Sequence, residues 1–298
     1  MAGLTNLAIT QAAKHAINGF KQGFPILSAL STRFDLDAGE AGDTVKVPVV
    51  DLTTTAQEQG AGGYDFKSVD ATGVDVKIGT TLGVPITIAD KDFSAMGKEA
   101  FGNYFEQQGM ILGRAVFERL VGAIKAAVVT GATSVNGETF DATNVNEIRS
   151  LCTQGGWPLA PRNLILDSTL VKPLFDDDAI KTASAYGDAG VIKDGSIGKL
   201  YGFDIFEVPQ MPDNGEGLKG IAIHPSGIAF ASKVIKPMDE AVANKVQSVQ
   251  YLPDANSGLT LVYRKFYDAN AKAMRTVLEI DFGFAIANAK AIRRIVGA

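Results

Sequence analysis

The longest hydrophobic pattern in the sequence runs from Asp90 to Gly131. Its apolar residues recur at steps of three, four and seven, which places them on one face of an α-helix. Asp90, Asp92 or Ser94 can cap the start of this helix, and Thr130-Gly131 supplies a stop. At a rise of 1.5 Å per residue we predict a helix on the order of 50 Å long, which needs an equally long apolar partner. The apolar face comprises Phe93, Met96, Phe101, Tyr104, Phe105, Ile111, Leu112, Val116, Leu120, Ile124 and Val128.

Several glycines interrupt this helical pattern. In a helix interior each costs about 1 kcal/mol relative to alanine. We therefore expect another backbone, from a sheet or a second helix, to approach the helix closely at these positions. They are Gly97, Gly102, Gly109, Gly113 and Gly122.

Residues 1–33 have apolar residues at roughly helical spacing and carry Lys14, Lys21 and Arg33 but no Asp or Glu. Two interpretations stay open. The segment is a terminal helix docked on its own domain, or it is an arm that packs on a neighbouring chain or faces a polyanion.

A two-residue alternation typical of strands occupies Thr44–Val50 and resumes over 74–88. The polar, Gly-rich stretch 51–73 separates the two runs. If the two runs pair with each other, they form a long two-stranded arm, and the polar stretch between them is its tip. An isolated hairpin is marginal in water, so its apolar face is expected to rest on something outside the hairpin.

Residues 140–235 predict a mixed α/β unit. Asn144 and Glu147 form a capping box for a short helix, whose buried face contains Val145, Ile148, Leu151 and Cys152 and which ends at Gly155-Gly156. Leu164–Leu166 predicts a buried strand, and Ser168 can cap a helical turn. A loop follows over 176–199. Strands are then predicted at Leu200–Val208 and Gly220–Ile223, and a short helix from Ser226 to Ala231.

The tail of the chain is rich in strands. Leu259–Tyr267 and Ala273–Phe282 alternate like paired strands, and an apolar finish follows at Phe284–Val296, interrupted by Arg293 and Arg294. This late sheet is the expected partner of the long helix.

Composition narrows the class of protein. The chain has 298 residues, 46% of them hydrophobic and 20% charged, as in globular proteins with more than one folding unit. A net charge of −5 argues against a generally basic, nucleic-acid-gripping surface. The single cysteine, Cys152, excludes an internal disulfide. Neither a signal peptide nor a membrane-spanning run is evident, so we expect a soluble, intracellularly made protein without a membrane partner.

Candidate chemistry is sparse. The histidines are His15 and His224, and a Cys152–His224 nucleophile–base pair is one alternative to a buried structural cysteine. Cys and His are too few for a zinc site, and Asp176-Asp177-Asp178 lacks the spacing of a calcium loop. No phosphate-binding glycine motif is present. We expect no enzyme activity, no metal and no cofactor.

Taken in order, these pieces resemble the major capsid protein of tailed bacteriophages, the Hong Kong 97-like fold of the α+β class. The resemblance covers nearly the whole length, and it depends on order and spacing rather than on one signature. It is carried by Val84–Asp90 before the helix, Leu200–Ile205, Gly220–Ala231, and Tyr267-Asp268 before Ile280–Ala285.

The resemblance implies a division of the chain. Residues 1–33 are the N-terminal arm, 34–89 the extended loop (a β-hairpin arm), and 90–139 the peripheral domain with its spine helix. Residues 140–235 are the α/β axial domain, and 236–298 are terminal strands that return to the peripheral domain.

The resemblance also implies a function. Hexamers and pentamers of the chain would self-assemble into an icosahedral shell enclosing double-stranded DNA by non-specific contact. Localisation would be the virion capsid, assembled in the bacterial host cytoplasm. Separate scaffolding, portal and decoration proteins would be partners, because the chain leaves no room for a scaffolding segment of its own.

Contacts between subunits are hypothesised for the whole stretch 51–73 and for six single residues. Lys67 with Asn256 or Asn288 is a further hypothesis, a covalent cross-link, against which an exposed solubilising lysine is the alternative. Two other functions stay open: an encapsulin-type nanocompartment shell, and a soluble α/β hydrolase using Cys152 or a serine. The six contact residues are Lys14, Phe20, Tyr64, Phe66, Lys67 and Tyr186.

Overall fold

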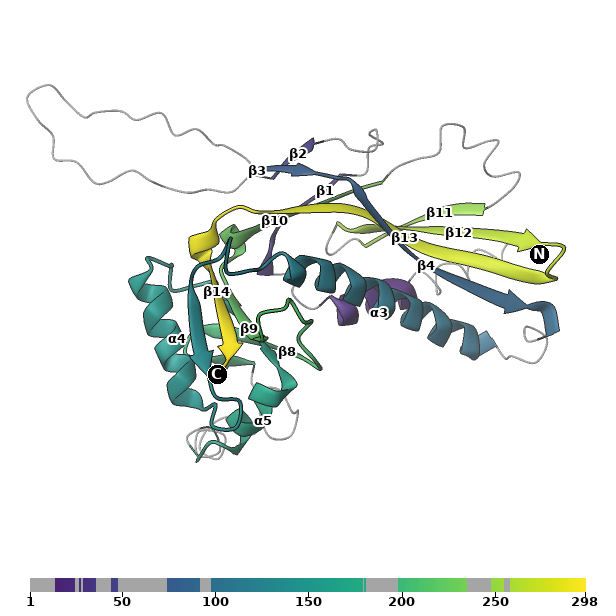
Figure 1. The fold of residues 1–298 in the computed structure, drawn as a ribbon. Coiled ribbons are helices and arrows are strands. Elements are labelled where there is room, and N and C mark those ends of the chain that lie inside the picture. Colours follow the sequence, from purple (N-terminus) through teal and green to yellow (C-terminus); the bar gives the residue numbers. More distant parts are fainter. Residues whose placement is uncertain are drawn as a thin grey trace, which may run out of the picture.

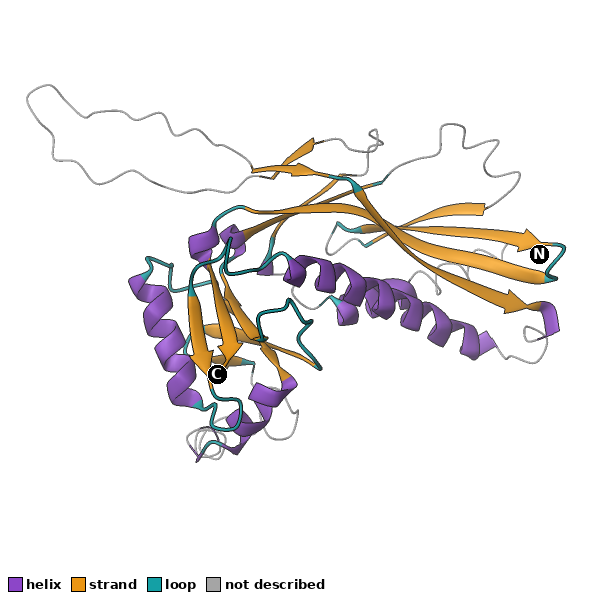
Figure 2. Cartoon of the chain, in the orientation of Figure 1, coloured by secondary structure: helices purple, strands orange, loops and turns teal. Residues whose placement is uncertain are grey.

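The computed structural model describes residues 14–24, 27, 29–35, 44–47, 74–91, 98–178, 180, 198–234, 248–254 and 258–298. These residues form two units (Figure 1): an elongated one, which we call the wing, and a smaller α/β unit. Each unit is built on its own mixed β-sheet, with helices packed against it (Figure 2).

The wing is a six-stranded sheet with one long strand, β13, at its centre. Strand β13 pairs with β10 from Phe282 to Ile286, with β4 from Ala273 to Phe282, and with β12 from Ala273 to Glu279. The order is β1-β10-β13-β12-β11, with β4 joined to β13 off this path. The strands are β1 (Ser31–Asp35), β4 (Thr80–Ala89), β10 (Ile228–Lys233), β11 (Ser248–Pro253), β12 (Thr260–Asp268) and β13 (Ala273–Ile286).

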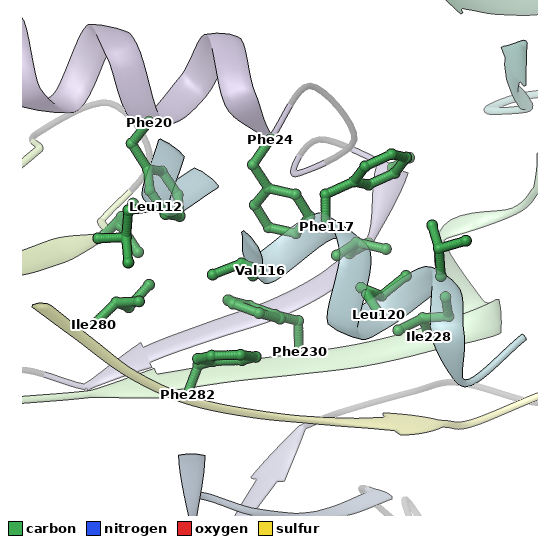
Figure 3. Packing of buried hydrophobic residues seen from close by; sticks show 14 of the residues in the cluster. Phe20, Phe24, Leu112, Val116, Phe117, Leu120, Ile228, Phe230, Ile280 and Phe282 are labelled. Carbon is green, nitrogen blue, oxygen red and sulfur yellow. The ribbon is translucent and has the colours of Figure 1, made fainter. Parts of the chain in front are cut away.

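Helix α3 (Lys98–Gly122) lies along one face of the wing sheet (Figure 1). Its Leu112, Val116 and Leu120 meet sheet residues such as Phe230 and Phe282, as Figure 3 shows. The rings of Phe230 and Phe282 stack with centroids 5.8 Å apart, and both are fully buried. The prediction that the late strands are the partner of the long helix is confirmed.

The helix is shorter than its hydrophobic pattern predicts. It ends at Gly122, not at Gly131, so its 25 residues span about 38 Å at 1.5 Å each. Beyond Gly122 the amide of Ile124 bonds to the carbonyl of Val121 at 2.9 Å, which tightens the chain into turns. The apolar spacing continues because Ile124 is still buried, although it is no longer helical.

Two residues predicted for the apolar face are exposed: Ile111 at 56% and Val128 at 48%. Phe117 and Val121 are buried instead, in the same core cluster as the wing sheet. Residues 14–23 form a second helix that packs on α3 near Gly109 and Gly113.

The α/β unit contains a six-stranded sheet in the order β5-β14-β9-β6-β8-β7. Helices α4 (Ala142–Gln154) and α5 (Ser168–Asp176) bury Val145, Ile148 and Leu170 in one core with Leu164 and Leu166 of β6. The strands are β5 (Ala132–Val135), β6 (Asn163–Asp167), β7 (Lys199–Leu200), β8 (Phe203–Val208), β9 (Leu218–Ile223) and β14 (Ile292–Gly297).

The two helix caps in this unit lie slightly earlier than predicted. The capping box of α4 joins Asp141 and Asn144, each side chain accepting the other's backbone N–H, and does not use Glu147. The cap of α5 is Asp167 and not Ser168. In both cases a carboxylate at the N-cap is favoured by the partial positive charge of the helix end.

The short helix predicted from Ser226 to Ala231 is wrong. Only Pro225–Gly227 forms a single 3-10 turn, η2, and the chain then continues as β10. Residues of β10 are buried on both faces and pair with β1 and β13, and this tertiary pairing outweighs the helical capping signal of Ser226.

The predicted two-stranded arm exists in part. Strands β2 (Thr44–Val47) and β3 (Val74–Lys77) form an antiparallel pair. The long alternating run after Gly79 is β4, which joins β13 and not the hairpin. Strands β10 and β14 also cross the predicted boundaries, since β10 lies in the wing and β14, at the end of the chain, lies in the α/β unit.

Candidate assembly surfaces

The N-terminal helix, residues 14–23, docks on α3 by direct contact between backbones. A Cβ at Gly109 would lie 2.0 Å from the carbonyl oxygen of Ala16, and one at Gly113 would lie 2.3 Å from that of Phe20. Only glycine permits this approach. Of the five glycines where a close approach was predicted, Gly109 and Gly113 confirm the prediction, and it is wrong at Gly122, where a Cβ would meet nothing within 4 Å. Of the two interpretations of this segment, docking on its own domain is confirmed for the described residues.

The predicted contact residues of this helix differ in their accessibility. Lys14 is exposed on its surface. Phe20 is fully buried and meets Phe24 edge to face, with ring centroids 5.9 Å apart. The prediction of Phe20 as a residue between subunits needs correction, because its ring is committed to the subunit's own core. The other predicted contact residues, Tyr64, Phe66, Lys67 and Tyr186, lie outside the described residues, as does the stretch 51–73.

The hairpin root, β2 with β3, rests on the face of the wing sheet opposite α3. Ala229 and Ala231 alternate with Phe230 along β10 and therefore point to that face, where they pack against Val47 and Val76. At Gly283 a Cβ would lie 2.2 Å from the carbonyl oxygen of Lys77. Small side chains thus let the hairpin cross directly over the sheet, and its apolar side rests on this chain.

A polar latch joins the wing to the α/β unit where α3 ends. Both carboxylate oxygens of Glu216 accept the backbone N–H of Ala126, at 3.0 and 2.9 Å. The same carboxylate binds the guanidinium of Arg294 at 2.5 Å. Segment 123–131 after α3 is therefore fastened to the loop before β9 and to β14.

Two further hydrogen bonds complete this latch. Arg294 Nε donates to the carbonyl of Val129 at 2.9 Å, and Asn214 Nδ2 donates to the carbonyl of Ile124 at 2.8 Å. Arg294 and Asn214 are buried, so each bond satisfies a polar group that water does not reach. Sequence reasoning missed these residues, because they lie about 80 to 165 positions from their partners.

The far tip of the wing is also held by side chains. Tyr267 donates its hydroxyl to Asp90 at 2.6 Å, and this hydrogen bond raises the pKa of Tyr267. Asp268 caps the turn after β12 by accepting the backbone N–H of Ala271 and pairs with Arg275 at 2.7 Å; together these lower its pKa. The end of β4 is thus tied to the β12–β13 turn.

The candidate nucleophile has no activating surroundings. Cys152 is buried in α4, and burial raises its pKa to about 11, opposite to the shift that a reactive thiol needs. His224 bonds to Ser226 at 2.7 Å and caps η2. A cavity of about 210 Å³ beside Cys152 is lined by Trp157, Lys290 and others, but not by His224.

Other chemistry finds little support in the described residues. Within them, no group of three or more His, Cys, Asp or Glu side chains is placed to hold a metal ion. No helix in the part of the chain that the structure describes has the length and apolar character to cross a membrane. Asp177 of the acidic triplet accepts the backbone N–H of Ala142 and so links α5 to α4.

The chain resembles known proteins in structure but not detectably in sequence. No protein-family model matches the chain, and no curated protein matches its sequence. The capsid structure of cyanophage P-SCSP1u matches at a TM-score of 0.54 with 13% identity, over 90% of this chain and 87% of that one. The mature capsid of bacteriophage PhiM1 matches at 0.52 with 12% identity, over 91% and 86%.

A virus-like particle from Pyrococcus furiosus also matches, at a TM-score of 0.51 with 11% identity, over 95% of this chain and 96% of that chain. At such identities the likeness establishes the fold. The chain therefore has the α+β fold of tailed-phage capsid proteins, and this prediction is confirmed.

Proposed function

We propose that this chain is a major capsid subunit of a tailed bacteriophage, which assembles as hexamers and pentamers into an icosahedral shell around double-stranded DNA. The observation that carries the proposal is the match to phage capsid subunits over about nine-tenths of both chains, 90% and 87% for cyanophage P-SCSP1u. A structural role without enzyme activity and a location in the virion capsid belong to the same proposal.

The geometry supports this role through the shape of the subunit. The wing carries α3 on one face and the hairpin root on the other, so both faces of one sheet are already occupied near β10. Further contacts must then lie at edges, tips and extensions, where many modest interfaces can add up in a symmetric shell. Lys14, Tyr64, Phe66, Lys67 and Tyr186 remain our proposed residues for such contacts.

The division into arm (1–33), extended loop (34–89), peripheral domain (90–139 with 236–298) and axial domain (140–235) is proposed in outline. Strand β10 comes from the axial segment but lies in the wing sheet, and β14 comes from the terminal segment but lies in the α/β sheet. The axial and peripheral parts therefore depend on each other structurally. Separate scaffolding, portal and decoration proteins are proposed partners.

The rival shell is a nanocompartment that encloses protein cargo, of the encapsulin type. It is kept because the Pyrococcus furiosus virus-like particle matches over 96% of its chain. The phage assignment is preferred because the other matches described above are phage capsids. The contents of the particles separate the two: packaged DNA for one, a co-purifying enzyme for the other.

The proposal is tested by expressing the full chain and weighing the product by light scattering, followed by electron microscopy. We expect closed particles or capsomers of hexameric and pentameric mass, with scaffolding protein supplied if closure needs it. A compact monomer at all concentrations, with or without a scaffolding protein, would overturn the shell assignment.

A further inference from the structure

An unusual run of exposed apolar residues lies in the α/β unit between α4 and β6. Pro158, Leu159, Ala160 and Pro161 are all exposed, and the side chain of Leu159 is 67% accessible. Tyr201, which is 44% accessible, lies in the β7–β8 turn. That turn touches the run, because a Cβ at Gly202 would lie 3.7 Å from the carbonyl oxygen of Leu159. We call these five apolar residues, 158–161 and Tyr201, the apolar patch.

The apolar patch is held rigidly from beneath by Arg162. This side chain is 1% exposed and donates to the carbonyl oxygens of Trp157 at 2.8 Å and of Pro158 at 2.5 Å. A further hydrogen bond, to Thr153 Oγ at 3.0 Å, ties the loop to the end of α4. The exposed run is therefore not a loose loop, and the buried guanidinium fixes the direction in which Leu159 projects.

The backbone at Tyr201 has an unusual conformation. Its φ of 47° lies in the left-handed region, which is unfavourable for a bulky residue and is retained where the surroundings impose it. Four consecutive exposed apolar positions are likewise uncommon on a protein surface unless they bind something. Both features lie on the same small surface.

We infer that the apolar patch is a contact site for a second copy of this chain. The inference rests on the proposed function, since it assigns one of the contacts that hold the shell together. The patch carries no charged side chain, and Lys199 of the adjoining β7 pairs with Asp204 at 3.2 Å within the chain. A charged partner such as nucleic acid therefore finds no attraction here.

The small size of the patch suits a contact that is repeated between many identical chains. Five residues fall well short of the roughly 20 to 30 per partner in a stable two-chain complex. The same contact repeated around a closed ring of identical chains adds up, and the patch adjoins β7, which has no strand on its outer side among the described residues. A second copy fits both features.

The direct test places a photo-reactive amino acid at position 159 (Leu159→p-benzoylphenylalanine) in the full chain and irradiates the assembled product. We expect a cross-linked dimer of this chain, with the attachment point mapped by mass spectrometry. Cross-links only to a different protein, to lipid or nucleic acid, or none at all, would overturn the inference, while particles formed by the unmodified chain would leave the proposed function standing.

A second measurement uses Leu159→Asp, with Asn146→Asp as the matched control. Asn146 is exposed on α4 of the same unit, so the control adds the same charge away from the patch. We expect Leu159→Asp to raise the concentration needed for assembly at least tenfold, with an unchanged thermal midpoint and circular dichroism spectrum, and the control to assemble like the wild type. Equal assembly of both variants would contradict the inference.

Discussion

At the scale of single residues, glycines decide how closely the elements of the wing approach one another. Gly109 and Gly113 of α3 leave room for carbonyl oxygens of the N-terminal helix, and Gly283 leaves room for the hairpin root. Gly122 differs, because a Cβ there would meet nothing within 4 Å. The helix-propensity cost of a glycine is thus offset by close packing at some positions and not at others.

This difference leads to the first prediction. Gly109→Ala places a methyl group where the Ala16 carbonyl lies, so residues 14–23 must shift, and the free energy of unfolding should fall by about 1–3 kcal/mol. Gly122→Ala, in the same helix, should change it by less than about 1 kcal/mol. Urea unfolding of both variants measures this, and equal losses would show that packing against the N-terminal helix is not the cause.

Asp167 gives a prediction about pH. It is buried, caps α5 through Thr169 and accepts the Met211 amide at 2.7 Å. Burial alone raises its pKa, but the hydrogen bonds from Met211 and Thr169 outweigh it and lower the pKa in the folded chain. Since the unfolded chain takes up this proton first, below about pH 4, the carboxylate stabilises the fold fully above that pH and progressively less below it.

Asp167→Asn should therefore lower the free energy of unfolding by about 1–3 kcal/mol near pH 7 and by less in acid. Denaturant unfolding at a series of pH values between 3 and 7 checks this. A difference between variant and wild type that stays constant across that range would refute the role given to the charge of Asp167.

At the scale of elements, the end of α3 shows how a helix is terminated by distant partners. Segment 123–131 continues the apolar spacing of the helix, yet Glu216, Asn214 and Arg294 capture its backbone groups. These hydrogen bonds replace those that a longer helix would make, and they join α3 to the α/β unit at a fixed place.

Glu216→Gln tests this arrangement, with Glu138→Gln as its control, because Glu138 is exposed in the turn before α4. The amide keeps one acceptor oxygen but loses the ion pair with Arg294, so we expect a loss of about 1–3 kcal/mol. Hydrogen exchange at the Ala126 amide should also become faster. If both variants exchange like the wild type, the latch does not restrain this segment.

At the scale of the whole molecule, the two units share one hydrophobic core. The cluster that contains α3 and the wing sheet continues into Ile165, Ile221 and Ile223 on one face of the α/β sheet. A shared core, the latch and the exchanged strands together favour a subunit of one fixed shape. A closed shell needs this property, since the angle between neighbouring copies must repeat.

The stretch 51–73 supplies the prediction at this scale. We expect that replacing it by a short Gly-Ser linker leaves a folded subunit, because the hairpin root has its own contacts with β10 and β13. The same variant should fail to form closed shells if this stretch carries contacts between copies. Unfolding measurements test whether the variant is folded, and electron microscopy tests whether it forms closed shells. Closed shells from the variant would refute the contacts assigned to residues 51–73.

Much of the fold could be predicted from local sequence. The apolar stripe of α3, strands β6, β12 and β13, and the end of α4 at Gly155 follow from periodicity and capping residues a few positions apart. The candidate surfaces were predicted less well. The apolar patch was missed because the exposure of Leu159 depends on the course of the surrounding loop. Phe20 was wrongly predicted to lie between subunits, because its burial depends on the packing of its helix on α3, which local sequence does not show.

The sequence by itself determined most of the helical and extended segments, because periodicity and capping depend on neighbours within a turn or a strand. It also marked Gly109 and Gly113 as positions where another backbone approaches closely. Only the tertiary structure decided that β10 belongs to the wing, that β14 closes the α/β sheet, and that α3 stops at Gly122. These outcomes depend on pairing and on buried polar bonds between residues far apart in the chain, whose energies local pattern does not contain.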